Sequence, residues 1–164
     1  MKHVLHSFAY ALDYFRDLVA DVPEREMSSQ RGGIVNHSSW LIGHLIFSCQ
    51  ELAAVVGVPP WLPRDWARRY GPGSAPHSDA SGYVSKQEAL AMLRDAQTRL
   101  TEAVEKLGDE DLDRPLPQES LRNLFPTVRH ALTQVLIGHT AYHIGQMSVW
   151  RKALGLPPIG RSFE

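Results

Sequence analysis

His139 and His143 stand four residues apart, in a segment whose apolar residues recur with helical spacing. The stripe that contains them consists of Leu132, Leu136, His139, His143, Gln146, Trp150 and Leu154. Steps of three and four residues are typical of a helix face that packs against neighbouring helices. Polar side chains on such a face need partners, and imidazoles at i and i+4 can converge on one metal ion. The pair is therefore a candidate metal-binding motif.

A second stripe supplies a third histidine. It consists of His37, Leu41, His44, Ser48, Glu51 and Val55. If this side of the helix faces the first stripe, His44 becomes the third ligand. Three neutral imidazoles form a catalytic zinc set and leave a coordination position for water or substrate; nickel, iron and manganese are alternatives. Glu51 and Gln146 are then expected around the ligands, where they order a histidine or a bound water.

Three other residues near the predicted site bear on its function. His37 is a candidate for contact with the ligands, but a surface position at the start of its helix is the simpler expectation. Tyr142, beside His143, is a candidate for lining the pocket. Thr140 occupies the place where the zinc-protease signature has its glutamate, so that type of peptidase is disfavoured. A metal-free alternative also stays open, in which the histidines pair with buried carboxylates.

Composition restricts the class of protein. The 164 residues suffice for one domain, expected to span 1–164. A net charge of -1 provides no basic field, so nucleic acid is not expected as a partner. Cys49 is the single cysteine and has no partner for an internal disulfide. The sequence shows neither a signal peptide nor an apolar run that would span a membrane, which favours a cytoplasmic protein.

Four segments with helical periodicity must position these residues. The spacing and the capping residues predict helices over about 3–20, 37–57, 85–107 and 127–154. The second is expected to be capped by Asn36 or Ser38, and the third by Ser85 in a capping box with Glu88. Residues 58–84 are long for a structureless connection and are expected to pack across the bundle or to contain a short helix. The prediction is an all-α four-helix bundle, a fold that often places metal sites between facing helices.

Two stretches carry a resemblance to a known family. They are residues 36–45, with the pattern Asn-x-x-x-Trp-x-x-Gly-His, and residues 138–147, with His-x-x-x-His-x-Gly-Gln. Together they resemble the DinB/YfiT-like superfamily of metal-dependent enzymes. The resemblance implies an up-down-down-up bundle, often homodimeric, with zinc or nickel on three histidines. Carried over by motif, these ligands are His44, His139 and His143.

The same resemblance suggests a reaction class, because some members transfer low-molecular-weight thiols. The leading hypothesis is thus a metal-dependent thiol S-transferase with a thiol cosubstrate and a small-molecule electrophile. In it Glu51 accepts a proton or orders a water. Two alternatives stay open: a metal-dependent hydrolase, and a non-catalytic metal-binding or stress-response protein.

Overall fold

The computed structural model describes residues 1–160, and these are almost entirely helices and their connections. Within this range there is no strand, only an isolated bridge between Pro115 and Thr127. The predicted all-α class is confirmed. The long helical elements are α1 (Lys2–Ala20), α2 (Ser38–Val55), α4 (Lys86–Glu105) and a final stretch made of α6 (Val128–Thr133), the π-helical segment η5 (Gln134–His139) and α7 (Thr140–Ala153).

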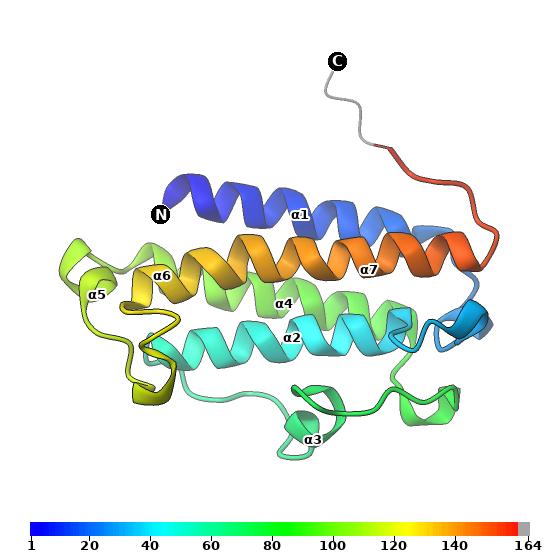
Figure 1. The fold of residues 1–164 in the computed structure, drawn as a ribbon, viewed down its shortest axis with the longest axis horizontal. Helices are drawn as coiled ribbons and strands as arrows, with labels where there is room; N and C mark the ends of the chain where they lie inside the picture. Colours follow the sequence, from blue (N-terminus) through cyan, green and yellow to red (C-terminus); the bar gives the residue numbers. More distant parts are fainter. Residues whose placement is uncertain (161–164) are drawn as a thin grey trace.

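These four long helical elements lie side by side (Figure 1). In that view α1 and α6–α7 run from left to right, whereas α2 and α4 run from right to left. Helix α2 packs chiefly on α4, and α1 packs on α7 and η5. The site described below lies where α2 meets the η5–α7 junction.

Helices α1 and α4 form as their sequence patterns predict. The apolar stripe of α1 is buried from Leu5 to Val19, and the helix ends before Pro23. The side chain of Ser85 accepts a hydrogen bond of 3.3 Å from the backbone N–H of Glu88, so the predicted cap of α4 is confirmed.

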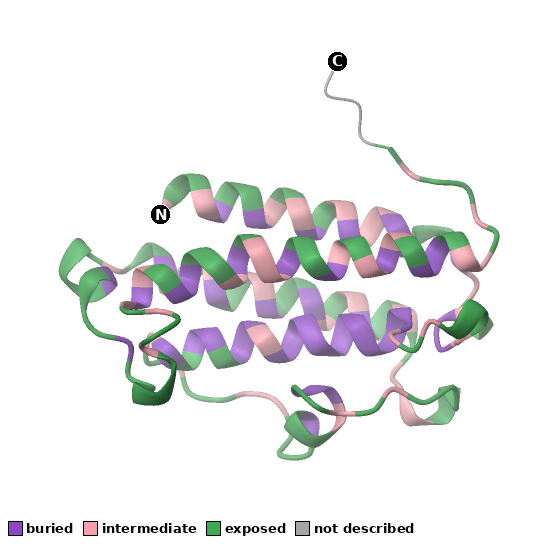
Figure 2. Cartoon of the chain, viewed as in Figure 1, coloured by how far each residue is buried: buried purple, intermediate pink, exposed green. Residues whose placement is uncertain are grey.

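Helix α2 differs from its prediction in two respects. Nearly all of its residues are buried, so it is a central helix rather than one with a single buried face (Figure 2). Its cap is His37, whose Nδ1 accepts from the backbone N–H of Trp40 at 3.4 Å, so the expected cap at Asn36 or Ser38 is wrong. The expected surface position of His37 is also wrong, since the residue is 0% exposed. The connection after α2 covers it, and the carbonyl of His77 in that connection accepts a hydrogen bond from Nε2 of His37.

The connection 58–84 contains the predicted short helix. Helix α3 (Trp66–Tyr70) packs on α2 through its two buried aromatic residues, and the 3₁₀ turn η3 (Ala80–Gly82) follows it. Short helices also occupy the other connections: η1 (Glu24–Glu26), η2 (Arg31–Gly33), α5 (Asp109–Asp113) and η4 (Glu119–Leu121). None of the helices in residues 1–160 has the length and apolar character required to cross a membrane.

Candidate metal centre

Three histidines converge between α2 and the η5–α7 junction. Nε2 of His139 lies 3.1 Å from Nε2 of His44 and 3.0 Å from Nε2 of His143. One ring nitrogen from each residue falls within a set whose members are all within 4.8 Å of one another. In a tetrahedral zinc site with Zn–N bonds of about 2.0–2.1 Å, ligand nitrogens are roughly 3.3 Å apart. The donor set therefore fits one divalent ion.

Hydrogen bonds at the far side of two rings orient their lone pairs. Nδ1 of His44 donates to the carbonyl oxygen of Tyr70 at 2.6 Å, and Nδ1 of His143 donates to Oε1 of Gln146 at 3.0 Å. These partners assign the proton to Nδ1 in both rings, so each Nε2 presents its lone pair to the cluster. Asn36 donates to the same Gln146 oxygen at 3.3 Å and holds the amide in place.

Burial keeps the three imidazoles neutral. It lowers the pKa of His139 to about 4 and that of His143 to about 3, with a further contribution from the neighbouring histidines. Burial also lowers the pKa of His44. Nδ1 of His139 is buried and has no hydrogen-bond partner among the described residues, so its polar contacts in the cluster are made through Nε2. Neutral imidazole is the form that binds metal.

The family comparison agrees with this geometry. The model of the DinB superfamily matches residues 7–147, which include all three histidines. The chain belongs to the DinB superfamily. Searches of curated proteins and of solved structures gave no significant match.

A π-helical segment sets the position of His139 in this DinB-superfamily chain. At its end the backbone N–H of Thr140 bonds to the carbonyl of Val135, five residues earlier, and the Thr140 hydroxyl donates to the same oxygen at 3.2 Å. A π-turn widens the helix by one residue, and such turns are frequent at functional sites. The sequence stripe contained two of the three clustered histidines but gave no sign of this local change in helical pitch.

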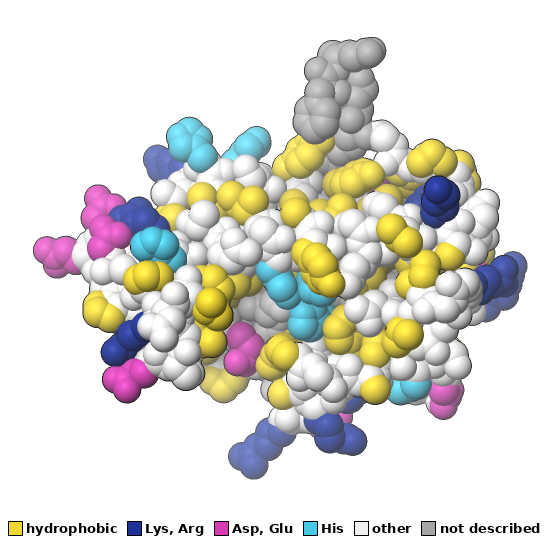
Figure 3. Space-filling model, in the orientation of Figure 1, with side chains coloured by type: hydrophobic (Ala, Val, Ile, Leu, Met, Phe, Trp, Pro, Cys, Tyr) yellow, Lys and Arg dark blue, Asp and Glu magenta, His cyan; other side chains and the backbone are white. Residues whose placement is uncertain are grey.

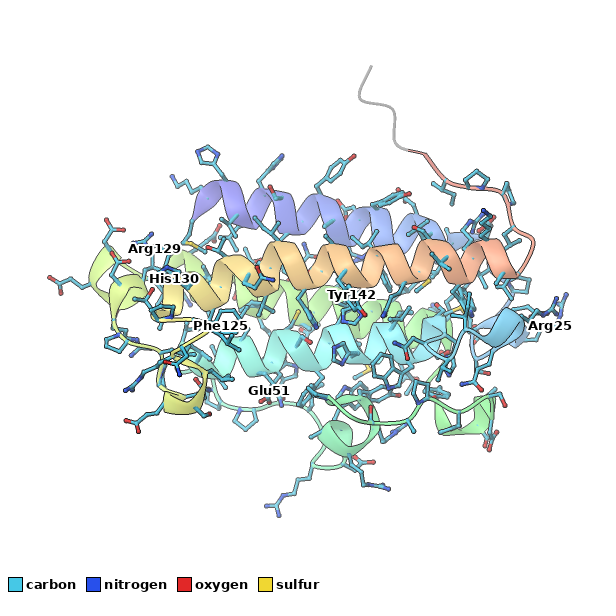
Figure 4. All side chains as sticks on the ribbon, viewed as in Figure 1. Arg25, Glu51, Phe125, Arg129, His130 and Tyr142 are labelled. Carbon is cyan, nitrogen blue, oxygen red and sulfur yellow. The ribbon has the colours of Figure 1, made fainter. Side chains whose placement is uncertain are left out.

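The other predicted site residues fall at different distances from the cluster. Tyr142 is 63% exposed on α7, and its ring meets the His143 ring edge-on with centroids 5.2 Å apart (Figure 4). Glu51 is exposed on α2 and is not a member of the cluster (Figure 4). The hydrogen bonds of His37 go to Trp40 and His77, not to the three clustered histidines. In residues 1–160 the cluster contains no carboxylate.

An open hollow lies beside the histidines. Figure 3 shows histidine atoms at the surface near the centre of this face. The hollow has a volume of about 650 Å³. None of its lining residues is charged: Ile34, Val35, Asn36, Ala141, Tyr142, Gly145, Gln146 and Val149. Tyr142 and Gln146 belong to this wall and also contact His143, so they connect the hollow to the histidine cluster.

Two features around His44 were not predicted as parts of the site. The ring of Trp40 stacks on the imidazole, with centroids 4.8 Å apart and planes 10° from parallel. The carbonyl of Tyr70 belongs to the connection 58–84, whose path the sequence left open. Trp40 and Gly43 belong to the same sequence pattern as His44, and their proximity to it in the chain was the signal available.

Proposed function

We propose that this protein binds one divalent metal ion through His44, His139 and His143, and that the ion is zinc or nickel. The observation that carries the proposal is the position of His139 Nε2, which lies 3.0–3.1 Å from Nε2 of both His143 and His44, while hydrogen bonds at Nδ1 orient these two rings. Neutral imidazoles suit zinc, nickel and iron, whereas manganese prefers carboxylate oxygens. Since no carboxylate joins the cluster in the described part of the chain, manganese is the least favoured.

We further propose an enzymatic role, in which a low-molecular-weight thiol is transferred to a small electrophile. Three protein ligands leave a coordination position for a substrate atom. A bound divalent ion supplies positive charge that favours the thiolate, the nucleophilic form of a thiol. The protein's own thiol is unsuitable, because Cys49 is buried and burial raises its pKa to about 12. The thiol is therefore a cosubstrate.

The surroundings of the cluster support binding of the electrophile next to it. The uncharged hollow between residues 34–36 and α7 suits an apolar group, while the amides of Asn36 and Gln146 offer hydrogen bonds. Tyr142 stands at the boundary between hollow and cluster and limits access of water to His143. Glu51 is exposed on α2 and is not a member of the cluster, so it would accept the thiol proton through solvent.

Hydrolysis is the second enzymatic candidate, and it is less well supported. Zinc peptidases place a glutamate next to the metal-bound water as general base. Here the corresponding residue is Thr140, whose hydroxyl donates to the carbonyl of Val135. A non-catalytic metal-binding or stress-response protein is the remaining alternative, and it predicts metal binding without turnover.

Metal binding is the decisive test. The chelator-treated protein is titrated with Zn²⁺ and with Ni²⁺ by calorimetry, and the bound metal is measured after dialysis. We expect one ion per chain in the wild type and a large loss of affinity in His44→Ala, His139→Ala and His143→Ala. His6→Ala is the matched control, since His6 is exposed on α1. A wild type that binds neither metal, or binding that survives in all three ligand variants, overturns the proposal.

Turnover is tested next. The metal-loaded protein is incubated with a panel of low-molecular-weight thiols and a chromogenic electrophile, and consumption of thiol is followed. Metal-dependent turnover that disappears in His139→Ala supports the transferase. Metal binding without turnover of any thiol supports the non-catalytic alternative. Homodimer formation and a cytoplasmic location stay predictions, the first of which a sizing measurement on the same preparation checks.

A further inference from the structure

The segment from Trp66 to Ser74, hereafter the α3 strap, lies against the first half of α2, where His44 is located. The strap makes three hydrogen bonds to this part of α2. The Tyr70 carbonyl accepts from Nδ1 of His44 at 2.6 Å, Trp66 Nε1 donates to the Gly43 carbonyl at 3.1 Å, and Ser74 Oγ accepts from Trp40 Nε1 at 2.9 Å. Since the Trp40 ring stacks on His44, the strap restrains the imidazole at its edge and at its face.

Gly43 provides the space for this arrangement. A Cβ atom at position 43 would lie 2.8 Å from Cγ of Tyr70 and closer still to two other carbons of the ring. The ring has little room to move away, because Tyr70 is 1% exposed and has close neighbours. Its centroid lies 4.7 Å from that of Trp66 and 5.1 Å from the Arg69 guanidinium. A glycine inside a helix costs roughly 1 kcal/mol relative to alanine. Gly43 therefore weakens α2 intrinsically and admits the Tyr70 ring in return.

We propose that Gly43 and Tyr70 are positioning residues for the metal ligand His44. By admitting the Tyr70 ring against α2, Gly43 lets the carbonyl of the same residue reach Nδ1 of His44. That bond holds the proton on Nδ1 and keeps the Nε2 lone pair directed at the metal position. A methyl group at position 43 displaces the ring and carries the carbonyl away with it. This inference rests on the proposed metal site and adds a requirement that the ligand motif alone does not contain.

Two glycines of the chain offer a matched pair of variants. Gly43→Ala and Gly145→Ala are the same substitution inside α2 and α7, but a Cβ at position 145 has no neighbour within 4 Å. The Kd for Zn²⁺ is measured by competition with a chromogenic chelator, and the melting temperature is measured without metal. Outer hydrogen-bond partners of metal ligands typically contribute about 10–100-fold in affinity. We expect a loss of that size for Gly43→Ala and unchanged affinity for Gly145→Ala.

Further variants separate positioning from general destabilisation. Tyr70→Phe keeps both ring and carbonyl and should bind Zn²⁺ like the wild type. The double variant Gly43→Ala/Tyr70→Ala removes the collision, so its affinity should equal that of Tyr70→Ala alone instead of combining two losses. Trp66→Phe is the substitute variant if Gly43→Ala does not fold. It keeps an aromatic side chain but removes the Nε1 hydrogen bond to the Gly43 carbonyl of α2, and it should weaken Zn²⁺ binding several-fold.

A spectroscopic readout on the metal-free protein completes the test. Long-range ¹H–¹⁵N correlation spectra report which nitrogen of His44 carries the proton. We expect the Nδ1–H form in the wild type and in Gly145→Ala, and a mixture of forms in Gly43→Ala. A Gly43→Ala protein that keeps the Nδ1–H form and the wild-type Kd overturns the inference, even if it melts at a lower temperature. Failure of the wild type to bind metal refutes the proposed function instead, and the spectra still decide whether Tyr70 orients His44.

Discussion

His37 gives the sharpest quantitative prediction, because it is a fully buried histidine outside the three-histidine cluster. Its Nδ1 accepts a hydrogen bond from the Trp40 N–H, and its Nε2 donates to the His77 carbonyl. A second proton therefore has no acceptor and would break the helix cap. Burial lowers the pKa of His37 from 6.5 to about 4. The unfolded chain thus takes up a proton before the folded protein does.

The sign and size of the effect follow from this difference. The contribution of His37 to stability is complete above about pH 6.5 and is lost as the pH falls toward about 4. One pKa unit corresponds to about 1.4 kcal/mol, so the whole difference is worth about 3 kcal/mol. Between about pH 7.5 and pH 5, roughly 2 kcal/mol of this is lost. This loss of roughly 2 kcal/mol is substantial beside the unfolding free energy of about 5–15 kcal/mol of a typical domain.

The assay compares the wild type with His37→Asn by urea unfolding at these two pH values, with chelator present. Asparagine is a good helix cap and does not titrate, so the variant keeps the acceptor for the Trp40 N–H. All other histidines are common to both proteins, so the difference between the two pH dependences isolates His37. We expect the wild type to lose about 2 kcal/mol more than the variant. Equal losses of unfolding free energy in the two proteins would refute the assignment of His37 as a buried, neutral cap. The control is His6→Asn, a substitution at an exposed position of α1, which should behave as the wild type.

Three further variants test other parts of the structure. Gln146→Leu removes the acceptor for Nδ1 of His143 and should weaken Zn²⁺ binding about 10–100-fold in a competition titration; an unchanged Kd would contradict the role of the amide. Arg151→Met removes the ion pair between the buried Arg151 and the half-exposed Asp21, and it leaves the carbonyls of Leu18 and Pro157 without their donor. We expect a loss of about 3 kcal/mol in urea unfolding, mainly from the unsatisfied carbonyls, and a change below about 1 kcal/mol would contradict it. Tyr142→Ala removes part of the apolar wall of the hollow. It should raise the KM for an apolar electrophile about tenfold with little change in kcat. An unchanged KM would mean that the substrate binds elsewhere.

The helices that carry the ligands were predictable from spacing, because buried apolar residues recur at the helical period and stop at proline and glycine. Leu5 to Val19 in α1 and the Ser85 cap of α4 are confirmed on these grounds. The spacing also predicted α2, but as a helix with one buried face, whereas nearly all of its residues are buried and its exposed residues are Glu51 and Ala54. The same burial explains His37, since a histidine covered by a distant connection has no local sequence signature.

The candidate ligands were predictable for a different reason, and their orientation was not. Two histidines one turn apart share a helix face whatever the details of the helix, so the pairing of His139 with His143 survives the π-helical segment that precedes Thr140. The π-turn itself is defined by the bond from the N–H of Thr140 to the carbonyl of Val135, five residues earlier. The apolar spacing of this segment does not indicate that bond.

The partner of His44 shows why the surroundings of a site are harder to predict than its ligands. The group that orients His44 is a main-chain carbonyl, which every residue possesses, so the side chain of Tyr70 contains no direct signal for it. The trace that this contact leaves in the sequence is indirect: a glycine at position 43, one residue before the ligand, where alanine would make a better helix. Alanine is excluded there because the Tyr70 ring occupies the space of its methyl group. A helix-weakening glycine next to a buried ligand is thus evidence that another part of the chain approaches closely, and here that part supplies the hydrogen bond that the ligand needs.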